Sequence, residues 1–154
     1  NFLTSEGALL TGLFHIALVP AVCEEVMFRG YVLRAFEKQW GVWSAILVSG
    51  VIFGLFHLQL SNLLPLAALG ILLALVTWLS GSLVPAMAAH FVNNGAAVVL
   101  GNHYPEMAFS QVTVENLPPF WILLMSALLS GFLLRQLYRN REQAVDQPPY
   151  QTGE

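Results

Sequence analysis

Three short groups of polar residues carry the side chains of this sequence that could perform chemistry. They are Glu24, Glu25 and Arg29 in the first group, His57 in the second, and His90 and Asn94 in the third. Carboxylates and imidazoles are the usual general bases of enzymes, and an imidazole and an amide four positions apart on a helix can direct two donors at one point. We therefore take these six residues as the candidate functional residues.

Spacing separates the two adjacent glutamates of the first group. In a helix, Glu25 and Arg29 are four positions apart and can pair on one face, whereas Glu24 is rotated by about 100° from Glu25. An ion pair that only makes an arginine tolerable in lipid would explain Glu25 and Arg29, but it leaves Glu24 without a partner. Glu24 is therefore the strongest candidate for a general base.

The two histidine groups are each open to two interpretations. Gly50 and Gly54 form a small-x-x-x-small pair that favours close approach of another helix, and His57 would lie beside that contact. As a lone histidine near a helix end, however, it is more often an interfacial residue. His90 and Asn94 are four positions apart and share a helix face, which suits either a pair of convergent donors or hydrogen bonding between helices.

The composition indicates a protein that is embedded in lipid. Of its 154 residues, 56% are hydrophobic and 10% are charged, against about 25% charged in a typical soluble domain. The net charge is −3 with no basic patch, which argues against a nucleic-acid partner. A single cysteine, Cys23, excludes a disulfide framework and a multi-cysteine zinc site. The start lacks an initiator Met, so we expect a fragment of a longer protein with upstream helices.

Long apolar runs predict an all-α, polytopic transmembrane helical bundle with about five spans. The runs are Leu9–Ala35, Val42–Leu58, Leu63–Leu79, Leu83–Leu100 and Phe120–Leu137. Residues 1–138 are predicted to form one N-terminally truncated membrane domain, and residues 139–154 a disordered tail. His103 falls in a predicted polar loop, and His15 has no pattern of partners around it.

Positive charges orient this bundle. Arg34 and Lys38 flank the first link, and Arg135, Arg139 and Arg141 lie four spans later, on the same side of the membrane. The positive-inside rule places that side, and the C-terminal tail, in the cytoplasm.

Helical rise gives the depth of each candidate in the membrane. Counting from the cytoplasmic links, Glu24 and His57 both lie at roughly 20 Å, but His90 lies at roughly 12 Å. If the three act together, His90 therefore needs a tilted helix, a broken helix or a link that is tucked into the bundle.

Together, the three groups resemble the CPBP family, which comprises the CAAX prenyl endopeptidases and bacterial CAAX protease self-immunity proteins. The family pattern is E-E-x-x-x-R, F-x-x-x-H and H-x-x-x-N or H-x-x-x-D. This sequence has Glu24-Glu25-x-x-x-Arg29, Phe53-x-x-x-His57 and His90-x-x-x-Asn94 in the same order. The resemblance covers residues 24–94, the central part of the family's shared domain.

The resemblance implies an intramembrane endopeptidase that hydrolyses peptide bonds. Glu24 and His57 would activate water, His90 and Asn94 would form the oxyanion hole, and Glu25 and Arg29 would support the site. A peptide or membrane-protein substrate and the lipid bilayer of a bacterial cytoplasmic membrane would be its partners.

No cofactor is expected, because the family's structural picture favours water activated by a glutamate. Zinc held by Glu24, His57 and His90 is the alternative. A non-catalytic bacteriocin self-immunity or scaffold protein, and a proton- or metal-linked transporter, also remain open.

Overall fold

The computed structural model describes residues 6–103, 131–132 and 134–139. Contacts divide the chain into two units, Asn1–Ser110 and Gln111–Glu154, and every helix named below belongs to the first. The described residues of the second unit, 131–132 and 134–139, are helical. The predicted span Phe120–Leu137 and the predicted tail lie mainly outside the described residues, so the boundary at residue 138 stays a prediction.

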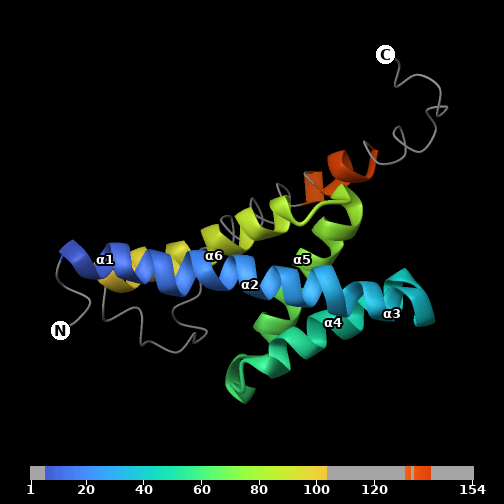
Figure 1. The fold of residues 1–154 in the computed structure, drawn as a ribbon, viewed down its shortest axis with the longest axis horizontal. Helices are drawn as coiled ribbons and strands as arrows, with labels where there is room; N and C mark the ends of the chain where they lie inside the picture. Colours follow the sequence, from blue (N-terminus) through green and yellow to red (C-terminus); the bar gives the residue numbers. More distant parts are fainter. Residues whose placement is uncertain (1–5, 104–130, 133, 140–154) are drawn as a thin grey trace, which may run out of the picture. The chain divides into compact units, whose positions relative to one another are not determined.

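One long helix forms the N-terminal part of the first unit (Figure 1). It consists of α1 (Glu6–Gly12), η2 (Leu13–Leu18), α2 (Val19–Glu25), η3 (Val26–Val32) and α3 (Leu33–Trp40), and the η segments are π-helical. In η2 the turns widen: the Val19 N–H donates to the carbonyl of Phe14, five residues back. Pro20 follows, and it has no N–H to continue the α-helical ladder. The helix ends at Gly41, whose φ of +77° favours glycine.

Three further helices complete the described bundle. They are α4 (Val42–Phe56), α5 (Leu63–Ser80) and α6 (Val84–His103), with a 3₁₀ turn, η4 (Leu60–Asn62), before α5. All three lie against the long helix or one another, and α6 runs beside α1 and α2 (Figure 1). The described segments contain no strand, and the prediction of an all-helical bundle is confirmed.

Glycines allow α4 and α5 to touch along their backbones. A Cβ placed on Gly54 would lie 2.9 Å from the Ala67 nitrogen, and one on Gly70 would lie 2.8 Å from the Gly50 carbonyl oxygen. A Cβ on Gly50 would collide with Ile71. The close contact predicted from the small-x-x-x-small pair is therefore confirmed, and α5 is the helix that makes it.

Three helices of the described chain are long and apolar enough to cross a membrane. They are Leu9–Trp40, Leu60–Ser80 and Val84–His103, with 32, 21 and 20 residues. The fourth apolar helix, α4, has 15 residues and is about 22 Å long, which is shorter than a hydrocarbon core of about 30 Å. The protein is an integral membrane protein, in which α4 is a shorter element than the predicted span.

The predicted ends of two helices require correction. The first apolar run continues as helix to Trp40, five residues beyond the predicted limit, because neither glycine nor proline occurs between Ala35 and Gly41. The fourth continues to His103, since the polar residues Asn102 and His103 extend its last turn instead of beginning a loop.

Candidate active site

Three of the four predicted catalytic side chains meet in the bundle. Glu24 lies at the end of α2, His57 caps the C-terminal end of α4, and His90 lies in the middle of α6. The Glu24 Oε2 atom is 4.0 Å from Nε2 of His57 and 3.9 Å from Nε2 of His90. Three segments that are far apart in the sequence therefore direct one carboxylate oxygen and two imidazole nitrogens at one point.

A tucked-in link gives His90 the depth of Glu24. A side-chain atom of Leu83, at the start of α6, lies 3.6 Å from the position of a Cβ on Gly30. Gly30 is eight residues from Lys38, so the α5–α6 link lies about 12 Å further along the bundle than the C-terminal end of the long helix. Glu24 is six residues from Gly30 and His90 seven from Leu83, which brings both to one level.

Behind these groups lies a fully buried charged cluster. Glu25 Oε1 accepts hydrogen bonds from Arg29 Nη1 and from Nδ1–H of His90, both at 2.9 Å. Arg29 Nη2 donates to the carbonyl of Gly70 in α5 at 2.8 Å. The side chains of Glu25 and Arg29 are 0% exposed. The predicted ion pair is confirmed, and it also fixes a ring nitrogen of His90, which the sequence did not indicate.

The hydrogen bonds of both histidines determine which nitrogen faces Glu24. His57 Nδ1 lies 2.9 Å from the Phe53 carbonyl, which can only accept, so this nitrogen carries the proton. His90 Nδ1–H donates to Glu25 in the same way. In the neutral form of each ring, Nε2 therefore presents a lone pair toward the Glu24 carboxylate.

Phe53 is the aromatic centre of the cluster, and spacing arguments did not give it a role of its own. Its buried ring lies 4.8 Å from the ring of His57 and 5.7 Å from that of His90. The Arg29 guanidinium lies over it at 4.6 Å, a cation–π distance. The signal was present in the sequence, because Phe53 precedes His57 by one helical turn.

Glu24 has hydrogen-bonding capacity that the described residues leave unfilled. Its Oε2 atom is buried and has no hydrogen-bond partner among them. The separations of 3.9 and 4.0 Å from the imidazole nitrogens are too long for direct hydrogen bonds. A water molecule can bridge a gap of this size. Placed about 2.8 Å from the Glu24 oxygen and from one imidazole nitrogen, it can donate a hydrogen bond to each of them.

Asn94 is the predicted catalytic residue that the structure directs elsewhere. Its Nδ2 donates to the carbonyl of Ile16 at 3.1 Å, and its Oδ1 accepts from Asn93 at 3.2 Å. The other two histidines also bond within their own helices, His15 to the Thr11 carbonyl and His103 to the Val99 carbonyl. Their side chains are outside the cluster of Glu24, His57 and His90.

Zinc would require a small change in this geometry. Ligands about 2.0–2.2 Å from a tetrahedral zinc are about 3.4 Å from one another. Glu24 and the two imidazoles have suitable donor atoms, but their separations are about half an ångström wider. Among the described residues, no group of three such side chains is arranged to hold a metal ion. Zinc stays an alternative prediction.

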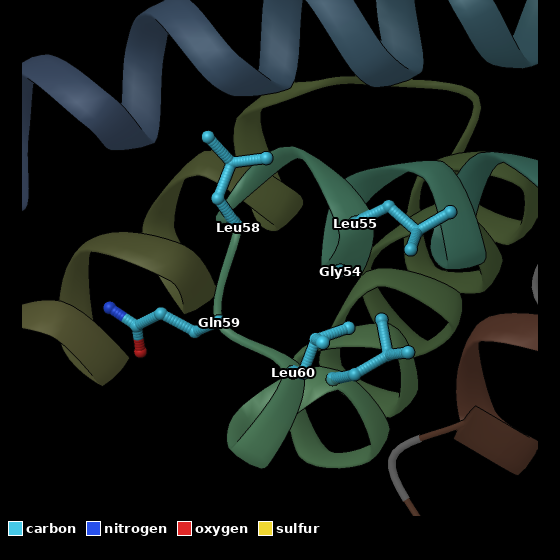
Figure 2. Close-up of a pocket in the computed structure, with 6 residues that line it drawn as sticks. Gly54, Leu55, Leu58, Gln59 and Leu60 are labelled. Atoms are coloured by element: carbon cyan, nitrogen blue, oxygen red, sulfur yellow. The ribbon is translucent and has the colours of Figure 1, made fainter.

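A separate apolar pocket lies at the turn between α4 and α5 (Figure 2). It has a volume of about 320 Å³ and is lined by Gly54, Leu55, Leu58, Gln59, Leu60 and Leu63. None of the candidate catalytic side chains lines it. Leu58 has a φ of +54°, the left-handed conformation that usually favours glycine.

The fold and the site define a helical membrane protein that holds a glutamate and two histidines at one point between its helices. A family model described as type II CAAX prenyl endopeptidase Rce1-like matches residues 6–96, which is more than half of the chain. The protein belongs to this family of CAAX proteases, and the resemblance drawn from the three motifs is confirmed. No curated protein and no solved structure matches the chain.

Proposed function

We propose that the protein is an intramembrane endopeptidase in which Glu24 and His57 activate a water molecule. The supporting observation is the Glu24 Oε2 atom, which is buried, has no hydrogen-bond partner among the described residues, and faces two imidazole nitrogens at 3.9 and 4.0 Å. A water at this point donates one hydrogen to the carboxylate and the other to an Nε2 lone pair. It is thereby prepared for deprotonation.

Hydrolysis then proceeds in two steps. The water oxygen attacks the scissile carbonyl carbon while its proton passes to Glu24 or to Nε2 of His57, and the carbonyl becomes a tetrahedral oxyanion. Collapse of this intermediate breaks the C–N bond, and the stored proton passes to the leaving amine. The partial exposure of Glu24 and His57, 22% and 28%, leaves room for a peptide on their side of the cluster.

His90 has a different part in this mechanism. Its Nδ1–H is already donated to Glu25, so Nε2 can donate to the oxyanion only when the ring carries a second proton. We propose that His90, whose Nε2 lies 3.9 Å from Glu24 Oε2, stabilises the oxyanion, and the oxyanion-hole role of Asn94 stays a prediction.

The substrate that we propose is a peptide or a membrane protein that reaches the cluster from within the bilayer. The family's name refers to CAAX prenyl substrates, and no residue described above distinguishes a prenyl group from another apolar one. The distribution of Lys and Arg supports a cytoplasmic C-terminus, and we propose a bacterial cytoplasmic membrane as the location.

Cleavage of membrane-protein substrates by protein in liposomes tests this function. We expect Glu24→Ala, His57→Ala and His90→Ala each to abolish cleavage, and Glu37→Ala, in an exposed ion pair with Arg34, to retain it. Wild-type cleavage by all three variants would exclude the peptidase. It would favour a non-catalytic role in bacteriocin self-immunity or as a scaffold.

Metal analysis of the purified protein, with a chelator added to the cleavage assay, tests the zinc alternative. Glu24, His57 and His90 would be the ligands, and zinc would supply a Lewis acid for the water and the carbonyl. Activity that survives the chelator in protein free of stoichiometric zinc favours the water activated by glutamate and histidine. Loss of activity that only zinc restores would replace it.

A further inference from the structure

Pro20 removes one backbone donor from the long helix, directly after the π-helical turns of η2, which contain Ile16. Where the hydrogen bonds return to α-helical spacing, the N–H of residue 20 would be the partner of the Ile16 carbonyl, and a proline supplies none. Within a membrane no bulk water replaces such a donor, so an open carbonyl is costly. The Ile16 carbonyl therefore offers an acceptor to a neighbouring helix.

Asn94 supplies the donor from α6. Its Nδ2 lies 3.1 Å from the Ile16 carbonyl oxygen, although the two residues are 78 positions apart. Asn93 donates to Asn94 Oδ1 at 3.2 Å, which holds the amide with its nitrogen toward the long helix. Both ends of the Asn94 side chain thus have partners in the described structure, and neither partner is Glu24, His57 or His90.

The rest of this helix contact is made by small residues. A Cβ placed on Gly95 would lie 3.6 Å from a side-chain atom of Leu13 and 4.0 Å from the Ala17 Cβ, and one on Gly12 would lie 3.0 Å from Val98. Small residues let two helices approach closely. Because they offer few interlocking side chains, they do little to stop one helix from sliding along the other. A directional hydrogen bond can set the register of α6 where they cannot.

We propose that Asn94 is a positioning residue, which ties α6 to the carbonyl left open by Pro20 and so sets the register of His90. This tie, the hydrogen bond from Asn94 Nδ2 to the Ile16 carbonyl, lies one helical turn from His90, about 6 Å along α6. A slip of one residue would move His90 by about 1.5 Å and break its 2.9 Å hydrogen bond to Glu25. Asn94 thus acts on the reaction through His90.

A double-mutant cycle between Pro20 and Asn94 separates this role from direct oxyanion binding. Asn94→Leu removes the donor at similar size, and Pro20→Ala supplies an N–H at residue 20 that can donate to Ile16. The four proteins, with Asn93→Leu as the neighbouring control, are compared in detergent for thermal unfolding and in liposomes for kcat and KM. This use of kcat rests on the proposed peptidase function.

The tie predicts coupling in both measurements. In the parent background, which retains Pro20, Asn94→Leu lowers the Tm and lowers kcat by about 100-fold, the loss that a misplacement of about 1 Å can cause. In the Pro20→Ala background the same change has a smaller effect on the Tm and lowers kcat by less than about 10-fold. Asn93→Leu has a smaller effect than Asn94→Leu, because Asn93 supports the amide only indirectly.

Direct oxyanion binding predicts a different result. Asn94→Leu would then lower kcat equally in both backgrounds, with no coupling in the Tm, and this outcome would overturn the proposal. The unfolding cycle needs no substrate, so it tests the tie even if the parent protein cleaves nothing. Inactive parent protein would therefore count against the peptidase, while uncoupled Tm values would count against the tie.

Discussion

Glu24 and Glu25 are adjacent in the sequence, yet they lie in two different environments. Glu25 is fully buried, and its Oε1 accepts hydrogen bonds from Arg29 and His90, both at 2.9 Å. Glu24 is 22% exposed, and its buried Oε2 has imidazole nitrogens at 3.9 and 4.0 Å but no hydrogen bond within the described chain. A rotation of about 100° along the helix produces this difference.

Two adjacent positions of one helix thus hold a carboxylate in a buried ion pair and a carboxylate that faces two imidazoles. A buried charge is tolerated when an opposite charge and hydrogen bonds compensate it, and Oε1 of Glu25 has both, whereas Glu25 Oε2 and Arg29 Nε have no hydrogen-bond partner among the described residues. A reacting carboxylate must keep capacity for water and substrate, so it cannot be compensated fully. Glu25 Oε1 accepts the hydrogen bond from His90 that holds its imidazole in place, and Glu24 is the carboxylate to which we assign the reaction in our proposal.

Breaking the buried pair should have the largest effect. Glu25→Ala leaves Arg29 without its carboxylate, and we expect a loss of about 3–5 kcal/mol of stability, as for other buried pairs that lose one partner. Cleavage should be lost as well, because His90 loses its Nδ1 acceptor. Thermal or denaturant unfolding in detergent measures the effect, with Arg34→Ala in the exposed Arg34–Glu37 pair as control at less than about 1 kcal/mol. Similar losses in the two variants would contradict the comparison.

Removing the charge of the open carboxylate should affect activity alone. Glu24→Gln keeps the size of the side chain but cannot accept a proton, so kcat should fall by about 10²–10⁴-fold, the usual contribution of a general base. Stability should stay within about 1 kcal/mol, since no hydrogen bond to Oε2 is lost in the described structure. Single-turnover cleavage and an unfolding curve on the same preparation check both parts. A large loss of stability with little loss of kcat would reverse the two roles.

The contact between α4 and α5 supports the buried pair from behind, and crowding it should have an intermediate effect. Gly70→Ala would place a Cβ 2.8 Å from the Gly50 carbonyl oxygen and shift the carbonyl that Arg29 binds. We expect a loss of about 1–3 kcal/mol, typical of overpacking. Gly7→Ala is the control, because nothing lies within 4 Å of its Cβ position. Equal Tm values for Gly70→Ala and the parent would show that the helices can separate freely.

The sequence predicted those features of the site that depend on local spacing. Apolar runs located the four helices of residues 6–103, and the distance of four positions gave the Glu25–Arg29 pair. The i,i+4 rule also separated Glu24 from this pair, before any tertiary contact was known. Such inferences succeed because a helix fixes the relative directions of its own side chains.

Apart from the close approach at Gly50 and Gly54, the partners in the contacts between helices could not be predicted from the sequence. The bond from His90 to Glu25 joins residues 65 positions apart, and no local rule indicates it. The count that made His90 shallower could not choose between a tilted helix, a broken helix and a tucked-in link, and only the tertiary contact of Leu83 with Gly30 favours the link. The hydrogen bond from Asn94 to the Ile16 carbonyl joins residues 78 positions apart, so spacing within one helix could not indicate it either.

The smallest effect should come from the residue that follows His57. Leu58 is 91% exposed and adopts a φ of +54°, which costs a non-glycine residue about 1–2 kcal/mol. Leu58→Gly relieves this strain but increases the entropy of the unfolded chain, so we expect a gain of about 0.5–1 kcal/mol in unfolding experiments. Leu60→Gly, at a position without a positive φ, should instead destabilise the protein. If Leu58 serves only to end α4, kcat is unchanged in Leu58→Gly. A drop in kcat of about tenfold or more would mean that the strained turn helps to hold His57 against Glu24. The arrangement of Glu24 and His57 would then depend on this turn as well as on the helices that carry them.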